Sequence, residues 1–167
     1  MKTAQQAEVT LPSEREVKVV RSFDAPRALV YRAHVEPALV RRWMLGPPGW
    51  SMPVCEMDLR VGGKYRWRWR ADDGGAEFGF YGEFRAVEPH IRLVHTETFD
   101  PGTMGGEHSG GEALITTSFD ETGGVTTVTT LMDFGTQESR DKAMSTGMTT
   151  GMEQSFQQLD RLLVEIG

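Results

Sequence analysis

Residues 55–70 read CEMDLRVGGKYRWRWR, and apolar and charged side chains alternate on both sides of the Gly62-Gly63 pair. A period of two is typical of a β-strand that buries one face. Because glycine tolerates the left-handed turn conformation, a loop at 61–63 predicts a hairpin. If the pairing of the two strands slipped by one residue, carboxylates would lie opposite tryptophans. The predicted partners are Leu59 with Tyr65, Met57 with Trp67, Cys55 with Trp69, Asp58 with Arg66, and Glu56 with Arg68.

Two further hairpins follow. A turn at Asp73-Gly74 would pair Trp69 with Phe78, and Trp67 with Phe80. A turn at 89–90 would pair Phe84 with His95, although a one-residue slip there would instead bury Val94, Thr96 and Thr98. One sheet face then carries an aromatic cluster together with His95 and Glu97. The opposite face carries Arg66, Arg68 and Arg70, each with a carboxylate across from it, which predicts a solvated salt ladder rather than a nucleic-acid-binding stripe.

The flanking segments complete an α+β pattern. A strand is expected at 15–22, a short helix after Asp24, a second helix from Pro37 to about Met44, and antiparallel strands from 52 to 133. Apolar residues at helical spacing predict one long helix from about Ser139 to Ile166, with Gly147 and Gly151 inside it. Residues 1–12 are expected to be a disordered leader and 13–167 a single domain. The glycine-rich segment 100–112 predicts a surface loop.

The composition and charge of the chain limit the kinds of partner and cofactor that we expect it to bind. The chain has 167 residues and a net charge of −6, which argues against nucleic acid or anionic membranes as partners. One cysteine, four histidines without ligand spacing, and the lack of nucleotide-binding motifs predict no metal and no cofactor. Without a long apolar segment, the expected location is cytoplasmic. Residues 1–70 hold 13 basic and 7 acidic side chains, whereas 71–167 hold 5 and 17. These halves could attract within one fold or between two copies.

Several motifs resemble those of the SRPBCC superfamily, which includes START-like and Bet v-like domains. They are FDAPRALVY at 23–31 and PALVRRW at 37–43 followed by Gly46-Pro47. The DLRVGG segment at 58–63 and the Thr146–Leu163 ending are similar to the signatures of the branch named for the activator of heat-shock-protein-90 ATPase homologue. The resemblance covers about 14–166 and implies a bacterial-type single-domain member with the helix-grip fold. In that fold a curved antiparallel sheet of about seven strands wraps around a long C-terminal helix, with a cavity between them.

This arrangement predicts a binding protein for a small apolar or aromatic molecule. Its cavity would be lined by Trp43, Met57, Tyr65, Trp67, Trp69, Phe78, Phe80, His95, Glu97, Met148 and Met152. An alternative is a cyclase- or hydrolase-type enzyme in which His95 is the general base and Glu97 tunes it. A second alternative is a module that activates a chaperone ATPase. Exposed strand edges and the uneven charge favour a homodimer.

Overall fold

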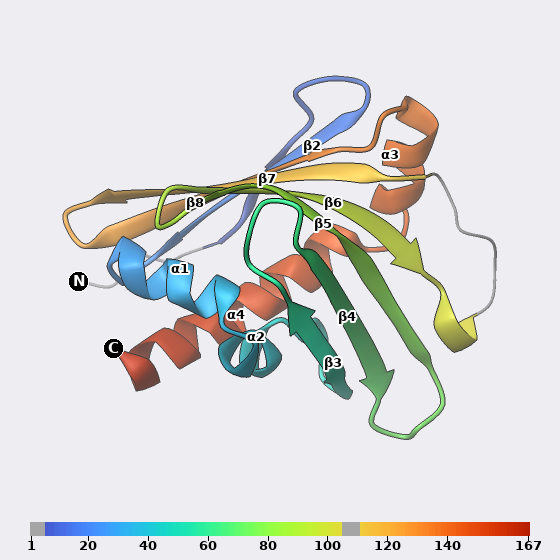
Figure 1. Cartoon of the computed structure of the whole chain (residues 1–167), viewed down its shortest axis with the longest axis horizontal. Helices are drawn as coiled ribbons and strands as arrows, with labels where there is room; N and C mark the ends of the chain where they lie inside the picture. The colour runs from blue at the N-terminus through green and yellow to red at the C-terminus, as the bar shows by residue number, and fades with distance from the viewer. Residues whose placement is uncertain (1–5, 105–110) are drawn as a thin grey trace.

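The computed structural model describes residues 6–104 and 111–167. The strands form one antiparallel sheet in the order β1-β2-β8-β7-β6-β5-β4-β3. Figure 1 shows α1, α2 and α4 together on one side of this sheet, which we call the inner face. The elements are β1 Glu8–Thr10, β2 Glu16–Phe23, α1 Arg27–Val35, α2 Pro37–Trp43, β3 Trp50–Met57, β4 Lys64–Ala71, β5 Glu77–Glu88, β6 Arg92–Asp100, η1 Gly102–Met104, β7 Ala113–Thr122, β8 Val125–Asp133, α3 Gln137–Met144 and α4 Met148–Ile166.

The predicted α+β class and the antiparallel sheet are confirmed, and the sheet has eight strands rather than about seven. The additional strand, β1, lies within the segment expected to be a disordered leader. It pairs with β2 through Val9 opposite Val19, and the Ala7 N–H beside it donates to Glu153 on α4 at 2.7 Å. Three residues are too few to show a period of two, so only the open edge of β2 reveals this pairing. Residues 1–5 and 105–110, the latter in the predicted surface loop, lie outside the described residues.

The register of the first hairpin differs by two residues from the prediction. Met57 pairs with Tyr65 and Cys55 with Trp67, because the connection spans 58–63 rather than 61–63. The Asp58 N–H bonds to the Lys64 carbonyl at 2.9 Å. A Cβ on Gly63 would lie 2.0 Å from the Asp58 carbonyl oxygen, so this tight loop requires glycine. A shift of two keeps every side chain on its predicted face.

The other two hairpins follow the predicted pattern more closely. Trp67 pairs with Phe80 and Trp69 with Phe78, as expected. In the third hairpin Phe84 pairs with His95, but a β-bulge between Phe84 and Ala86 sets Ala86 opposite Val94. Both registers considered from the sequence are therefore present, one on each side of the bulge. The bulge absorbs the extra residue without turning His95 to the outer face.

The predicted final helix is two helices. Gly147 has φ +79° and separates α3 from α4, so it is not in a helix interior. The hydroxyl groups of Ser145 and Thr146 donate to the carbonyls three residues before them, each at 2.6 Å. These local bonds stabilise the end of α3, and glycine then takes the left-handed conformation that changes the chain direction.

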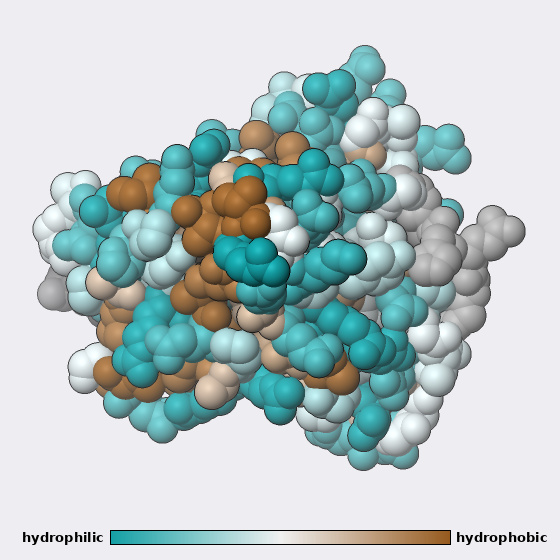
Figure 2. Space-filling model, in the orientation of Figure 1, coloured by the Kyte–Doolittle hydropathy of each residue, from teal (hydrophilic) through white to brown (hydrophobic). Residues whose placement is uncertain are grey.

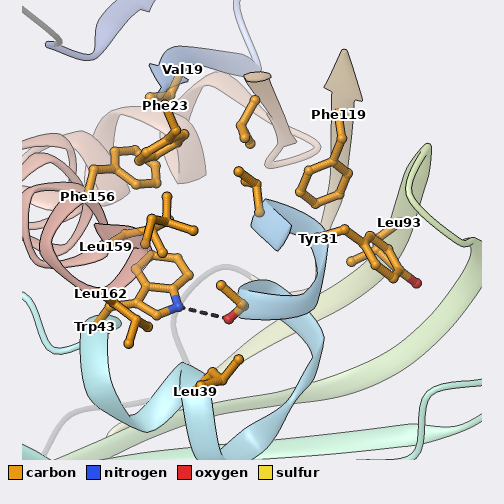
Figure 3. Packing of buried hydrophobic residues seen from close by; sticks show 14 of the residues in the cluster. Val19, Phe23, Tyr31, Leu39, Trp43, Leu93, Phe119, Phe156, Leu159 and Leu162 are labelled. Carbon is orange, nitrogen blue, oxygen red and sulfur yellow. Dashed lines mark hydrogen bonds between the residues drawn. The ribbon is translucent and has the colours of Figure 1, made fainter. Parts of the chain in front are cut away.

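Two groups of buried side chains form the core. The first joins α1, α2 and α4 to β2, β7 and β8, and Figure 3 shows Trp43 and Phe156 inside it. The Trp43 indole N–H donates to the Ala33 carbonyl at 2.9 Å, and its ring stacks on Phe156 at 6.2 Å. The second group lies where β3, β4 and β5 meet α2, and contains Val40, Met52, Cys55, Tyr65, Trp67, Trp69 and Phe84.

The outer arginine ladder is less solvated than expected at its centre. The Arg68 side chain is 14% exposed and binds Glu77 at 2.8 Å and Asp100 at 2.5 Å. Arg70 reaches Glu77 at 3.4 Å, as the predicted register requires. Asp100 completes the cluster because β6 pairs with β5 in the predicted register, which sets Asp100 opposite Gly79 and so beside Arg68.

Candidate functional site

The candidate site lies on the inner face of β4, β5 and β6. Alternation along β4 directs Tyr65 and Trp67 inward, and β6 brings His95 beside them. The His95 ring centroid is 5.1 Å from that of Tyr65 and 5.9 Å from that of Trp67. Phe84 closes the group at 6.1 Å from His95. The predicted meeting of His95 with the aromatic residues is thus present in the fold.

Two buried ring nitrogens in this group have no hydrogen-bond partner among the described residues. They are Nε1 of Trp67 and Nδ1 of His95, and each of these two residues is 8% exposed. Their neighbours differ: Trp69 Nε1 donates to the Met44 carbonyl at 2.6 Å, and the Tyr65 hydroxyl donates to the Thr96 carbonyl at 2.5 Å. A buried polar atom without a partner costs about 1–3 kcal/mol, and the centroids of the two rings that carry these nitrogens lie 5.9 Å apart.

Burial disfavours the charged form of both titratable side chains at the site. Burial lowers the pKa of His95 to about 4, so its imidazole is neutral at pH 7. Burial raises the pKa of Glu97 to about 7. Burial is the cause of the raised Glu97 pKa, and within the described part of the chain no hydrogen bond or charge from a basic group or from His95 contributes to it. The two residues therefore do not form the hydrogen-bonded pair that general-base catalysis would use.

Partly exposed aromatic rings continue the inner face away from His95. Phe80 packs against Phe99 with centroids 5.5 Å apart, and Phe78 stacks on Trp69 at 5.5 Å. Trp50 contacts Phe78 from β3 at 5.3 Å. Phe99 and Trp50 were not among the predicted site residues. The alternation His95, Glu97, Phe99 along β6 is the signal that could have identified Phe99.

The remaining predicted residues do not all gather here. Trp43 belongs to the first core group, and Met148 and Met152 pack against that same group. Met57 packs at the margin of the second group. A Cβ on Gly151 would meet no atom within 4 Å, so the α4 surface is open at that position.

The predicted cavity between sheet and α4 stays a prediction. Two hollows of about 320 and 540 Å³ lie elsewhere, and no predicted site residue lines either one. The smaller is bordered by Lys18, Thr116 and Thr129 on the outer face of the sheet. In residues 6–104 and 111–167, no three His, Cys, Asp or Glu side chains lie close enough together to hold a metal ion. None of the helices described is both long and apolar enough to cross a membrane.

Comparison with known proteins agrees with the fold. A protein of Rhodobacter sphaeroides shares 28% identity over 96% of this chain and 99% of its own, with a TM-score of 0.86. A protein of Arthrobacter aurescens shares 25% identity over 95% and 91%, with a TM-score of 0.82. An AHSA1-like protein of Aeromonas hydrophila shares the fold at 22% identity over 87% and 93%, with a TM-score of 0.69.

No curated protein matches the chain. The family model described as "Activator of Hsp90 ATPase homolog 1-like protein" matches residues 24–164, which include the candidate site, the second core group, and all the buried residues of the first core group except Val17, Val19 and Phe23. Within this match lie residues 24–31 of the first motif, the motif at 37–43, and the segments at 58–63 and 146–163 that suggested this branch of the SRPBCC superfamily. The chain belongs to the family of Activator of Hsp90 ATPase homolog 1-like proteins.

Proposed function

We propose that this protein binds a small apolar or aromatic molecule on the inner face of β4, β5 and β6. The observation that carries the proposal is the pair of buried, unpartnered ring nitrogens of Trp67 and His95 within an aromatic surface. Small-molecule sites are mostly apolar and contain a few convergent polar atoms, and this surface has that composition.

The aromatic margin adds support. Phe78, Phe80 and Phe99 are partly exposed although they lie on the face that the helices cover. An aromatic ligand laid on them would bury apolar area that the protein leaves in water, at about 25 cal/mol per Å². Aromatic rings would also stack on it in edge-to-face or offset geometry.

The enzyme alternative has weaker support. A histidine whose pKa burial lowers to about 4 is a poor general base near neutral pH. No described side chain holds its ring in one orientation by a hydrogen bond to Nδ1. The chaperone-activating role and the enzyme role both stay predictions.

Binding can be tested with a matched pair of variants. Phe80→Ala removes a ring from the inner face, whereas Tyr81→Ala removes its neighbour, which is 42% exposed on the outer face. We expect Phe80→Ala to weaken the binding of 2-methylnaphthalene about tenfold in calorimetry, and Tyr81→Ala to leave it unchanged. Native mass spectrometry of the freshly purified protein should retain a small molecule. Equal affinities in the two variants, or no binding to the wild type, would contradict the proposal.

A further inference from the structure

Glu97 lies between two small residues on the inner face of the sheet. On β7 it pairs with Ala113. On β5 it faces Gly82, because the Phe84–His95 pair lies two positions away along the same two strands. A Cβ on Gly82 would lie 2.0 Å from a carbonyl oxygen of β6, so this position requires glycine. No long side chain therefore flanks Glu97 on either neighbouring strand, and Glu97 itself is partly exposed.

Among the described residues, no basic side chain offsets the negative charge of Glu97. Burial alone raises the pKa of Glu97 to about 7. His95, two residues before it on β6, is neutral at pH 7 because burial lowers the pKa of its imidazole to about 4. Arg68 of β4 lies on the outer face, where it binds Glu77 and Asp100. A cation bound beside Glu97 would favour its ionised form and oppose the effect of burial.

Aromatic rings border Glu97 on the same face. Phe99 follows it by two residues on β6, and Phe80 packs against Phe99 with ring centroids 5.5 Å apart. Both phenylalanines are partly exposed. Burial, and next the charge of Glu97, raise the pKa of Tyr65 on β4, so the field of the carboxylate extends into the aromatic group. Because the faces of aromatic rings also attract cations, the rings and the carboxylate favour the same kind of charge.

We propose that this site binds an arylalkyl amine, whose ammonium group pairs with the Glu97 carboxylate while its apolar body lies over Phe80 and Phe99. The inference rests on the proposed function and names the class of ligand. The aromatic surface supplies apolar contact area, and the carboxylate selects a positive charge. An uncharged ligand would leave Glu97 without a counter-ion, and an acid would place a second negative charge beside it.

A matched pair of variants isolates the position of the charge. Glu97→Gln keeps the shape of the side chain and removes the carboxylate from the inner face. Glu83→Gln makes the same change on the outer face of β5, where Glu83 lies opposite Lys64 and its side chain is 41% exposed. Both substitutions change the net charge equally, so a difference in binding between them reports the location of the carboxylate.

The experiment compares 2-naphthylmethylammonium, 2-naphthylmethanol and 2-naphthoate by calorimetry at pH 8, where Glu97 is mostly ionised. We expect the wild type to bind the ammonium compound about fivefold more tightly than the alcohol, and 2-naphthoate most weakly. Glu97→Gln should remove most of the preference for the ammonium group, and Glu83→Gln should retain it. Equal binding of the ammonium compound and the alcohol, or a preference that survives Glu97→Gln, overturns the inference.

A second measurement locates the ammonium group in the unaltered protein. Nuclear Overhauser contacts should join the methylene protons beside the ammonium to the Ala113 methyl group, and the naphthyl protons to the rings of Phe80 or Phe99. Methylene contacts elsewhere in the protein overturn the ligand class but leave the proposed function intact. If none of the three compounds binds, the proposed function itself fails.

Discussion

At the scale of single residues, the polar groups on the inner face carry the pH dependence of stability. The pKa of Glu97 rises from its ordinary 4.5 to about 7 in the folded protein because burial disfavours the charged carboxylate. A carboxyl with a raised pKa stabilises the folded state below the unfolded pKa, and this contribution is lost as pH rises through the folded pKa. Glu97 thus lowers the free energy of unfolding above pH 4.5, fully above pH 7.

We expect Glu97→Gln to remove this pH-dependent loss in the free energy of unfolding. The variant should match the wild type near pH 4.5, gain relative stability as pH rises, and be more stable by about 1–3 kcal/mol at pH 8. Because His95 is present in both proteins, its own titration cancels in the difference. Urea denaturation from pH 4.5 to 8 measures it, and a difference independent of pH would show that Glu97 is solvated.

Arg21 illustrates the opposite case, a buried charge that is fully paired. Its guanidinium is 1% exposed, binds Asp160 at 2.8 Å and Glu153 at 3.2 Å, and so links β2 to α4. We expect Arg21→Ala to lower the free energy of unfolding by about 3–5 kcal/mol, since it leaves two carboxylates without their cation. Arg42→Ala removes an exposed pair with Glu165 and should cost less than about 1 kcal/mol. Similar losses in the two variants would contradict this account.

At the scale of elements, the two glycines of the C-terminal segment are predicted to behave oppositely. Gly147 has φ +79°, so Gly147→Ala should destabilise by about 1–2 kcal/mol. Gly151 lies inside α4 with no atom within 4 Å of an added Cβ, so Gly151→Ala should stabilise by up to about 1 kcal/mol. Thermal unfolding of the two variants checks this, and stabilisation by both substitutions would mean that α3 and α4 form one helix in solution.

At the scale of the whole molecule, the basic and the acidic half of the chain form ion pairs with each other within one fold. Arg21, Arg42 and Arg68 of the basic half each pair with carboxylates of the acidic half. Figure 2 shows hydrophobic side chains gathered near the middle of the displayed face, and Val61 and Ile91 are 66% and 47% exposed in two hairpin connections. Any contact between copies through these two side chains would be apolar. The predicted homodimer remains a prediction.

We therefore expect salt to act on stability rather than on assembly. Raising ionic strength from about 0.05 to 0.5 M shortens the screening length from roughly 14 to 4 Å. The melting temperature should fall slightly because intrachain pairs are screened, while the sedimentation coefficient should not decrease. A dimer that dissociates at high salt would show that the charged halves meet between copies.

Local side-chain alternation was enough to predict the order of the hairpins, their inner and outer faces, and the approach of His95 to Tyr65 and Trp67. These features follow from a period of two, which neighbouring residues specify. The Gly62-Gly63 pair marked a turn, whereas Gly147 was expected inside a helix. They did not specify whether a loop would hold three residues or six, or whether a helix would end.

Contacts between distant segments decided the rest. β1 exists because β2 presents an open edge, and the first hairpin takes its register partly because Gly62 and Gly63 bond to Phe84 on β5. Trp67 and Trp69 are indistinguishable in the alternating pattern, yet only Trp69 meets a carbonyl, because α2 ends beside it at Met44. Hydrogen-bond satisfaction depends on which backbone groups come within about 3 Å, and that is a property of the assembled fold.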